Sequence, residues 1–442
     1  MEATATRIVR RLRDAGHEAY FAGGCVRDRL LGRTAHDIDV ATSARPEEVQ
    51  KLFPRTVAVG AQFGVIVVLE GGVEFQVATF RADGVYLDGR RPESVTFTSA
   101  EGDAQRRDFT VNGLFFDPIE GRILDFVGGE ADLKAGIVRC IGVPAERFRE
   151  DKLRLLRGVR FAATLGFRID PPTWSALREM ASLITAVSAE RIREELVKIF
   201  VHPSRVRGFD LLDESGLLEV LLPEVTKMKG CEQPPEFHPE GDVFVHTRLM
   251  LSLLPETVSV PLVFSVLLHD IGKPPAYQVD ETGRIRFNGH ESLGAEMAER
   301  IFDRLRFSNA QTEAAVVAVQ NHMAFKDVQN MRIATLKRFL ARPTIDDELE
   351  LHRVDCLGSH GLIDNYDFLL AKTEEFSREP LIPPPLVTGQ DLISIGWKPS
   401  PLFKRILDAV QVRQLEGSLT SRAEAMEWVA SHRDFVEKGD SP

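Results

Sequence analysis

Two different spacings of hydrophobic positions divide the first 135 residues into helices and strands. Apolar residues three and four apart predict helices over 5–15, 26–31 and 46–53. Short runs rich in β-branched and aromatic residues predict strands over 19–21, 37–41, 63–69 and 73–80. Gly71-Gly72 joins the last two runs and predicts a tight hairpin. Alternation of these elements predicts an α/β segment.

Beyond this segment the pattern becomes helical. Apolar residues keep helical spacing from Glu150 to about Leu222, and a second helical block from Val243 to about Phe376 carries most of the histidines. A proline-rich stretch, 380–385, predicts a short rigid linker before a last helical segment from about Ser400. The expected fold class is α+β, an α/β head followed by mostly helical parts. We predict four domains, over 1–135, 136–225, 226–380 and 381–442.

Composition narrows the class of protein only slightly. At 442 residues, with 43% hydrophobic and 27% charged positions, the chain is expected to be globular with more than one core. The sequence contains no run of 18 apolar residues, so it predicts no membrane helix. The first residues lack the apolar core of a signal peptide. The four cysteines are scattered without a C-x-x-C pair, which favours a reducing, cytoplasmic location over disulfides or structural zinc.

The charge of the chain is unevenly distributed. The net charge is −11, which by itself speaks against a nucleic-acid partner. Between Arg139 and Phe209, however, 14 Lys and Arg stand against 8 Asp and Glu. A basic segment within an acidic protein is compatible with a phosphate-bearing partner along one face.

Two aspartates provide the most informative local pattern. Asp37 and Asp39 are two residues apart in a predicted strand, so both point to one face while Ile38 points to the other. Two carboxylates that converge in this way favour a bound cation, and hard oxygen ligands suit Mg²⁺. The preceding Gly23-Gly24 turn lets backbone amides approach an anion closely. Together these features are typical of phosphoryl or nucleotidyl transfer.

The same residues carry a resemblance to a known family. An isolated Asp-x-Asp is common in solvated turns, but Gly-Gly-x-Val-Arg-Asp followed by Leu-Leu-Gly and Asp-x-Asp is far more specific. The combination resembles the first motif of the class II tRNA nucleotidyltransferase and poly(A) polymerase family, whose head is polymerase β-like. The resemblance implies that Asp37 and Asp39 are catalytic and hold Mg²⁺. It also implies that Gly23, Gly24 and Arg27 hold the triphosphate.

A second motif of this family matches Arg106-Arg107-Asp108-Phe-Thr-Val-Asn112. Guanidinium forks match phosphate oxygens bidentately, so Arg107 is expected to bind the triphosphate. Asp108 and Asn112 are able to hydrogen-bond a ribose hydroxyl. A third carboxylate for the transferase metals is also expected, and Glu74 on the predicted hairpin is the candidate.

A third motif matches Glu150-Asp151-x-x-Arg154, followed by arginines at 157 and 160. Arginines at every third residue are expected to lie along one side of a helix, with Asp151 and Arg154 as i,i+3 neighbours. By resemblance, Glu150, Asp151 and Arg154 select the base of CTP or ATP in place of a template. Arg157 and Arg160 would anchor phosphate or the helix itself.

Two further segments bear on which nucleotides are added. Residues 81–92 are rich in Gly, Asp and Pro and predict a loop. In the family a loop of this length is typical of enzymes that add the terminal A. The Gly-basic-basic-Phe signature of the poly(A) polymerase branch is absent, and Gly60-Ala-Gln-Phe-Gly64 stands in its place, which favours the tRNA branch.

Histidines and aspartates in the second helical block form an ordered series. A single histidine is more often structural than a ligand, but this series has the order H…HD…H…H…D and resembles the HD phosphohydrolase domain. The expected metal ligands are His246, His269, Asp270, His290, His322 and Asp355. Imidazole with carboxylate suits a divalent transition metal or Mg²⁺. By resemblance, 2′,3′-cyclic phosphates and damaged RNA ends are candidate substrates.

The sequence therefore predicts a cytoplasmic tRNA nucleotidyltransferase that builds or repairs the 3′-CCA end from CTP and ATP, with an HD phosphohydrolase domain and no membrane partner. An A-adding-only enzyme and a poly(A) polymerase remain alternatives. An HD phosphohydrolase with a vestigial transferase head is an alternative of another class. The tail from Leu386 resembles a tRNA-contacting region but departs from the family at Lys398-Pro-Ser-Pro401.

Overall fold

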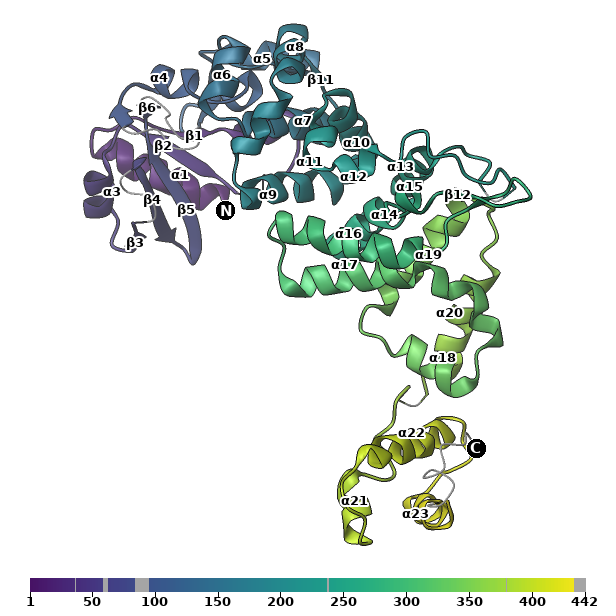
Figure 1. Ribbon diagram of the computed structural model, residues 1–442. Helices are drawn as coiled ribbons and strands as arrows, with labels where there is room; N and C mark the ends of the chain where they lie inside the picture. The colour runs from purple at the N-terminus through teal and green to yellow at the C-terminus, as the bar shows by residue number, and fades with distance from the viewer. Residues whose placement is uncertain (36, 59–62, 84–94, 237, 379, 433–442) are drawn as a thin grey trace. The chain divides into compact units, whose positions relative to one another are not determined.

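The chain forms two compact units (Figure 1). The computed structural model describes residues 1–35, 37–58, 63–83, 95–236, 238–378 and 380–432. Unit 1 comprises Met1–Lys227, Pro255–Val258 and Arg300–Ser308, and unit 2 comprises Met228–Leu254, Ser259–Glu299 and Asn309–Pro442. The four domains expected from the sequence are a finer division and stay a prediction. Within the described residues, no helix has the length and apolar character needed to cross a membrane.

Unit 1 begins with a mixed sheet of seven strands in the order β3-β4-β5-β2-β1-β8-β9. The strands are β1 (Ala19–Ala22), β2 (Asp39–Thr42), β3 (Thr56–Val57), β4 (Val65–Glu70), β5 (Val73–Thr79), β8 (Phe115–Asp117) and β9 (Arg122–Leu124). Only β2 and β5 are parallel neighbours. The hairpin β4–β5 turns at Gly71 and Gly72, whose φ angles of 63° and 79° are left-handed and explain the glycine pair.

Helices cover both faces of this sheet. On one face α1 (Glu2–Asp14) and α3 (Pro46–Leu52) bury Ile8, Val40 and Phe75 in one core. On the other face α4 (Ala100–Gln105) packs its alanines near Ala41 and Phe115. A separate short helix, α2 (Gly24–Leu30), follows β1. The α+β class is confirmed, and the three helices and four strands expected in this region all form with ends shifted by a few residues.

A helical part follows within unit 1, together with the short strand pair β10 (Ile137–Val138) and β11 (Arg168–Ile169). Its helices are α5 (Gly129–Ala135), α6 (Pro144–Glu150), α7 (Arg154–Leu165), α8 (Pro171–Glu179), α9 (Ala189–Phe200), α10 (Arg205–Glu214), α11 (Leu217–Leu221) and α12 (Pro223–Thr226). Helix α7 lies in the middle and packs against α9 and α10. Helix α10 approaches α9 at Gly208, where a Cβ would lie 2.4 Å from Ile199 Cγ2.

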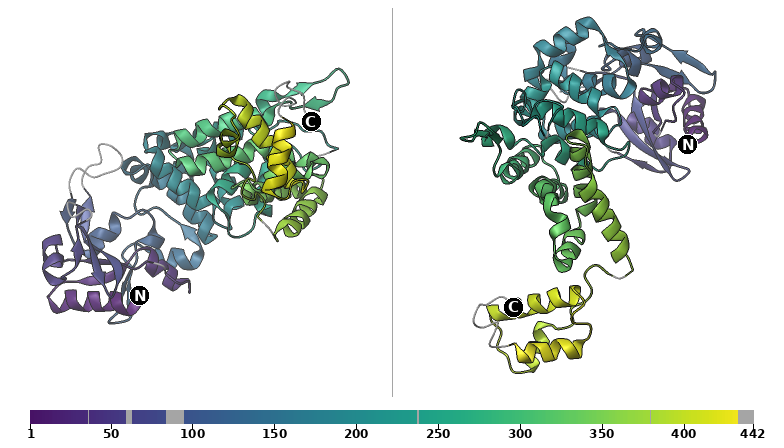
Figure 2. Two further views of the ribbon diagram at one scale, coloured as in Figure 1. Left: turned by 90° about the horizontal axis from the view of Figure 1, so that it is seen from below. Right: turned by 90° about the vertical axis from the view of Figure 1, so that its right-hand side faces the viewer.

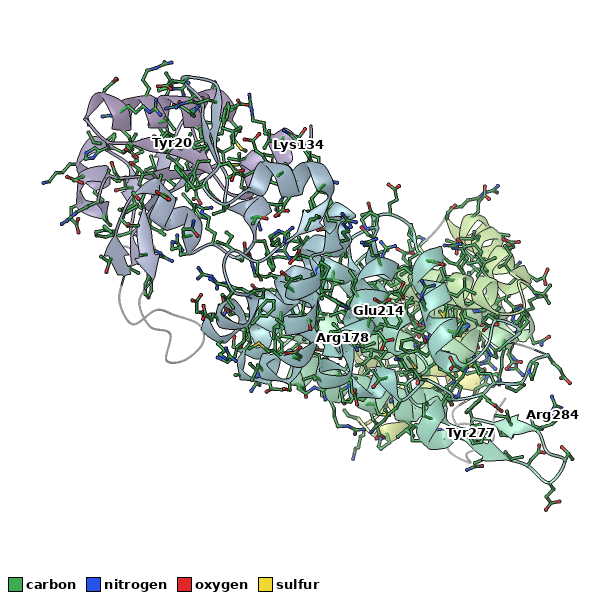
Figure 3. The ribbon with its side chains drawn as sticks, turned by 90° about the horizontal axis from the view of Figure 1, so that it is seen from above. Tyr20, Lys134, Arg178, Glu214, Tyr277 and Arg284 are labelled. Atoms are coloured by element: carbon green, nitrogen blue, oxygen red, sulfur yellow. The ribbon has the colours of Figure 1, made fainter. Side chains whose placement is uncertain are left out.

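Unit 2 is built around the apolar helix α14 (Val260–Leu268), which packs against α13 (Val243–Leu253), α17 (Asn309–Asn321) and α19 (Ile345–Gly358). The remaining helices of this part are α15 (Lys273–Ala276), α16 (His290–Arg304), α18 (Ile333–Leu340) and α20 (Asp364–Phe376). A small hairpin of β12 (Gln278–Val279) and β13 (Ile285–Arg286) interrupts the helical pattern, and Tyr277 and Arg284 mark it in Figure 3. The sequence pattern did not predict this hairpin.

The last helices, drawn in yellow in Figure 2, have a small core of their own. They are α21 (Gly389–Ser394), α22 (Pro401–Leu415) and α23 (Arg422–Ser431). Leu392, Trp397 and Ile406 are buried together in this core. The helix expected from about Ser400 is α22, preceded by a helix that was not expected.

Candidate active sites

The two aspartates of the first motif lie at the start of β2. Exposure alternates along this segment, because Asp37 and Asp39 are exposed while Ile38 and Val40 are buried against the helices of the sheet. The strand itself begins only at Asp39, two residues later than expected. Partial desolvation raises the pKa of Asp39 above its ordinary value, Arg107 opposes this rise, and Asp37 adds to it. Repulsion between two such carboxylates is relieved by a cation, so the pair fits Mg²⁺.

The glycine turn before α2 brings the backbone close to an arginine. Gly23 has a φ of 76°, and a Cβ at this position would lie 2.9 Å from Arg107 Nη1. Any larger residue would therefore both strain the backbone and displace this guanidinium. Four residues after Gly23, Arg27 donates to Asn112 Oδ1 at 2.7 Å, which links the first motif to the second.

Two acidic residues hold the arginines of the second motif. Asp103, buried at the end of α4, accepts from Arg106 at 2.8 Å and from Arg107 at 2.9 Å. Burial favours the neutral acid, but the two arginines outweigh it and lower the pKa of Asp103. The sequence analysis did not identify Asp103, although its spacing of three and four residues from the arginines is the signal that would have found it.

Asp108 is paired with Arg157 across the second and third motifs. Its carboxylate lies 2.5 Å from Arg157 Nη2 and also accepts from Asn112 Nδ2 at 3.1 Å. Burial alone would raise the pKa of Asp108, yet Arg157 lowers it to about 2. Asp108 is thus a fixed anion that positions Arg157.

The third motif is not one continuous helix, which corrects the sequence analysis. Helix α6 ends at Glu150, Asp151 is extended with φ −130° and ψ 104°, and α7 begins at Arg154. The Asp151 carboxylate accepts from the Leu153 amide at 3.1 Å, so this residue closes a turn just before α7 and interrupts the helix. Asp151 and Arg154 are consequently not neighbours on one helical face.

Arg154 is buried and held from three sides. Its guanidinium donates to Glu150 at 2.7 Å, to the Arg147 carbonyl at 3.1 Å and to the Arg106 carbonyl at 3.0 Å. Arg191 from α9 holds Asp151 at 3.0 Å. The break between the helices therefore leaves an acceptor and a donor in fixed positions.

Residues from all three motifs line one pocket of about 520 Å³ within unit 1. Its lining consists of Gly23, Gly24, Arg27, Asp39, Arg81, Arg106, Arg107, Asp108, Asn112, Asp151, Arg154, Arg157 and Phe161. Arginine therefore predominates, as a triphosphate site requires. Of the expected residues with described positions, Asp37, Glu150 and Arg160 lie outside this lining, and Arg160 pairs with Glu195 of α9 at 2.5 Å.

Phe161 is a pocket residue to which the sequence analysis gave no role. The guanidinium carbons of Arg27, Arg157 and Arg160 lie 5.3, 5.2 and 4.1 Å from the centre of its ring. A ring face attracts cations, so Phe161 stabilises three like charges side by side. Its place at the C-terminal end of the arginine series was visible in the sequence, but the approach of Arg27 from α2 was not.

The strand register puts Gln76 level with Asp39, and Glu74 two residues further back, on the side of Asp37. Strands β2 and β5 are parallel, and Val40 lies opposite Val77. The residues that precede these two, Asp39 and Gln76, are therefore also level with each other. Glu74 lies two residues before Gln76 and is outside the pocket lining. A carboxylate role for Glu74 stays a prediction.

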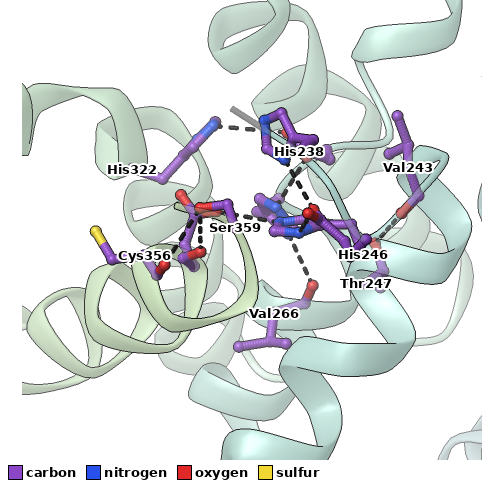
Figure 4. A network of polar contacts seen from close by, with 12 residues as sticks. His238, Val243, His246, Thr247, Val266, His322, Cys356 and Ser359 are labelled. Atoms are coloured by element: carbon purple, nitrogen blue, oxygen red, sulfur yellow. Dashed lines mark hydrogen bonds and ion pairs between the residues drawn. The ribbon is translucent and has the colours of Figure 1, made fainter. Parts of the chain in front are cut away.

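In unit 2, the expected HD residues come together in the core (Figure 4). His246 comes from α13, His269 and Asp270 follow α14, His290 begins α16, and Asp355 belongs to α19. His246 Nε2 lies 3.1 Å from Asp355 Oδ1, and His269 Nε2 lies 3.0 Å from Asp270 Oδ2. His290 Nε2 lies 3.0 Å from His322 Nε2 and 3.5 Å from Asp270 Oδ1.

The donor set of this cluster fits a divalent metal. Three groups of ligand atoms each lie within 4.8 Å of one another. They come from His246, His269 and Asp270, from Asp270, His290 and His322, and from His238, Glu240 and His246. His269 Nε2 and both oxygens of Asp270 are buried and lack a hydrogen bond of good geometry among the described residues. Buried polar atoms without such partners are costly unless an ion satisfies them.

Electrostatics support neutral ligands at two of the histidines, whereas at His246 burial lowers the pKa but Asp355 and Glu240 raise it to about 9. Burial lowers the pKa of His322 to about 4, and burial also lowers the pKa of His290, so both rings are neutral ligands at neutral pH. Burial would raise the pKa of Asp270, but His269 and Lys273 hold it well below its ordinary value. Lys273 Nζ lies 2.7 Å from Asp270 Oδ2, a contact that the sequence analysis did not identify in Asp-Ile-Gly-Lys.

Comparisons with known proteins agree with these two sites. The sequence matches the "Poly A polymerase head domain" over residues 19–139. It matches the "Probable RNA and SrmB- binding site of polymerase A" over 166–229 and the "HD domain" over 244–356. The fold and the pocket of unit 1 thus define a polymerase head of the poly(A) polymerase type. The chain is therefore similar, in this order along the sequence, to the head and RNA-binding domains of poly(A) polymerases and to an HD domain.

Individual relatives are CCA-adding enzymes. Those of Streptococcus gordonii and Geobacillus kaustophilus are each 46% identical over 218 residues, which are 49% of this chain and 54% of the relative. The match thus spans about half the length of these curated relatives. A crystal structure of the Bacillus stearothermophilus CCA-adding enzyme in complex with CTP is similar with a TM-score of 0.74 and 27% identity, over 98% of both chains. The Thermotoga maritima CCA-adding enzyme complexed with tRNA shares the fold, with a TM-score of 0.60 and 19% identity over 96% of this chain and 94% of that one.

Proposed function

We propose that unit 1 adds or repairs the 3′-terminal CCA of tRNA, using CTP and ATP and releasing pyrophosphate. One observation carries this proposal: a single pocket joins Asp39 of the sheet, the arginines of the second motif and the Asp151–Arg154 pair. A carboxylate for metal, cations for triphosphate and a donor–acceptor pair for a base are the three requirements of nucleotide selection without a template. The CCA-adding relatives support the same conclusion.

In the reaction, the tRNA 3′ hydroxyl attacks the α-phosphorus, a new P–O bond forms, and the bond to pyrophosphate breaks. Asp37 and Asp39 would hold Mg²⁺, which lowers the pKa of the attacking hydroxyl and neutralises the leaving pyrophosphate. Arg27 and Arg107 bind the triphosphate, and the Gly23–Gly24 turn lets it approach the backbone. Arg154 presents donors and Asp151 an acceptor to the base.

The decisive experiment offers three tRNA transcripts, ending before CCA, after C and after CC, with CTP and ATP separately and together in Mg²⁺. Completion of all three to CCA is expected, with Asp39→Ala as the inactive control. Extension of only the CC-ended transcript would make the protein an A-adding enzyme, and long A tracts on any RNA would make it a poly(A) polymerase. The loop proposed to govern A addition lies largely in residues 84–94, outside the described residues.

We propose a second activity, metal-dependent phosphohydrolysis, for the HD cluster in unit 2. The observation that favours it is the convergence of four imidazoles and two carboxylates, among which His269 Nε2 and both oxygens of Asp270 lack a hydrogen bond of good geometry among the described residues. A divalent transition metal or Mg²⁺ would activate water there. The test is hydrolysis of 2′,3′-cyclic nucleotides or RNA-end phosphates. The unaltered chain is expected to hydrolyse them, and His269→Ala is expected not to. If hydrolysis proceeds while all three tRNA transcripts stay unextended, the transferase head is vestigial.

A further inference from the structure

Three of the four histidines in the HD cluster are oriented by backbone carbonyls three residues earlier. Their Nδ1 atoms lie 2.7 to 2.9 Å from these oxygens. The pairs are His269 with Val266, His290 with Phe287, and His322 with Val319. A carbonyl oxygen only accepts, so each Nδ1 carries the proton and each Nε2 presents its lone pair to the centre of the cluster.

His246 is the exception. The carbonyl three residues before it belongs to Val243, and this oxygen accepts the Thr247 hydroxyl at 2.9 Å (Figure 4). His246 Nδ1 has no hydrogen bond of good geometry among the described residues, and it lies 2.6 Å from Oε1 of Glu240, a residue of the segment before α13. The imidazole is fully buried, so the orientation of this ring depends on that one contact and on Asp355 at its other nitrogen.

Glu240 is itself fixed in place. His238 Nδ1 lies 2.9 Å from the same Oε1, and the Glu240 side chain is only 9% exposed. The second oxygen, Oε2, is buried and without a hydrogen-bond partner among the described residues. A carboxylate buried in this way next to a ring nitrogen is the arrangement by which proteins set the tautomer of a metal-binding histidine.

We infer that Glu240 is the positioning residue for His246, with His238 holding Glu240, so that the segment before α13 completes the HD metal site. Glu240 keeps the proton on Nδ1 and leaves Nε2 to the metal, the role that backbone carbonyls play for the other three histidines. An anionic acceptor also makes the imidazole a stronger ligand than a carbonyl would. This inference rests on the proposed HD function.

The test is metal binding to the full chain, measured by calorimetric titration with Co²⁺ and by the visible absorption of bound Co²⁺. Glu240→Ala is expected to weaken Co²⁺ binding about 10- to 100-fold. Glu240→Gln keeps an acceptor of the same shape, so a loss of less than about 10-fold is expected from it. The matched control is Glu236→Ala in the same segment, a side chain that is 75% exposed and is expected to leave the affinity unchanged.

Several outcomes would overturn the inference. Unchanged Co²⁺ affinity in Glu240→Ala would remove Glu240 from the site, provided that the unaltered chain binds Co²⁺. Loss of one whole Co²⁺ equivalent, with the remaining affinity intact, would make Glu240 a metal ligand and not a positioning residue. Equal losses in the Ala and Gln variants, with a lowered melting temperature in both, would reduce its role to packing. Absence of Co²⁺ binding in the unaltered chain would instead refute the proposed HD metal site itself.

Discussion

At the residue scale, each arginine of the unit 1 pocket has a partner that fixes its direction. Asp103 holds Arg107, Asp108 holds Arg157, and Asn112 holds Arg27. Long flexible side chains lose much entropy when a ligand orders them, so arginines already held by acceptors bind phosphate at lower cost. The acidic partners therefore belong to the binding site although they repel the ligand.

Arg154→Ala is expected to loosen the choice between CTP and ATP about tenfold, because one well-placed polar contact is worth roughly 1.4 kcal/mol. The affinity for triphosphate should change little, since the other pocket arginines remain. Competition between CTP and ATP on the transcript ending before CCA measures this choice. Arg149→Ala, an exposed position on α6, is the matched control. Unchanged nucleotide preference would exclude Arg154 from base selection.

The Asp108–Arg157 pair predicts an acid-dependent loss of stability. Because the folded-state pKa of Asp108 is about 2, below its ordinary value, the pair stabilises the fold above about pH 4. That contribution, about 2 kcal/mol, is lost as the pH falls towards 2. Melting temperatures recorded between pH 5 and pH 2 should fall less steeply for Asp108→Asn, which starts from a lower value at neutral pH. Parallel curves for both proteins would show that the pair does not titrate in this range.

At the element scale, the positions of helix ends determine both sites. The gap between α6 and α7 presents Asp151 and Arg154, and the end of α14 presents His269 and Asp270. At a helix end, backbone groups lack their usual intrahelical partners, and side chains or ligands satisfy them. A substitution that moves one of these ends should therefore affect function more than one in the middle of a helix.

Gly272 offers a test of this kind. Its φ of −78° suits any residue, but a Cβ would lie 2.2 Å from the His290 carbonyl oxygen and 2.7 Å from the Gly294 amide. Gly272→Ala should therefore push α16 away, destabilise unit 2 by about 2–3 kcal/mol and weaken metal binding. Thermal unfolding and Co²⁺ titration measure the two effects. Gly389→Ala, whose Cβ would lie 3.8 Å from Phe403, is the control expected to change neither.

At the scale of the whole molecule, each unit carries one complete site. The carboxylate pair and arginine pocket lie in unit 1, and every residue expected to bind the HD metal lies in unit 2. Because the two sites share no described side chain, the two proposed activities should be separable.

Asp37→Ala is expected to reduce nucleotide addition at least about 1,000-fold, as loss of a metal-holding carboxylate removes several kcal/mol of transition-state stabilisation. It should leave phosphohydrolysis intact. His269→Ala is expected to give the opposite result. Both activities, measured on each purified variant with circular dichroism as the folding check, test this separation. Loss of both activities in one folded variant would show that the two sites are coupled.

The sequence by itself determined the local parts of this protein. Strand alternation placed Asp37 and Asp39 on one face, Gly71-Gly72 specified a hairpin, and the ordered histidines and aspartates specified the ligands of one cluster. Such patterns are readable because they depend on the period of a strand or helix and on residues close in the chain.

Only the tertiary structure decided which distant side chains meet. Asp103 came to hold Arg107, Phe161 joined the pocket, Gln76 came to lie level with Asp39, and Glu240 came to face His246. The break after Glu150 also overrode a helical pattern, because Asp151 closes a turn before α7 and pairs with Arg191 forty residues away. Strand register and long-range ion pairs depend on how whole elements pack, and no local period encodes them.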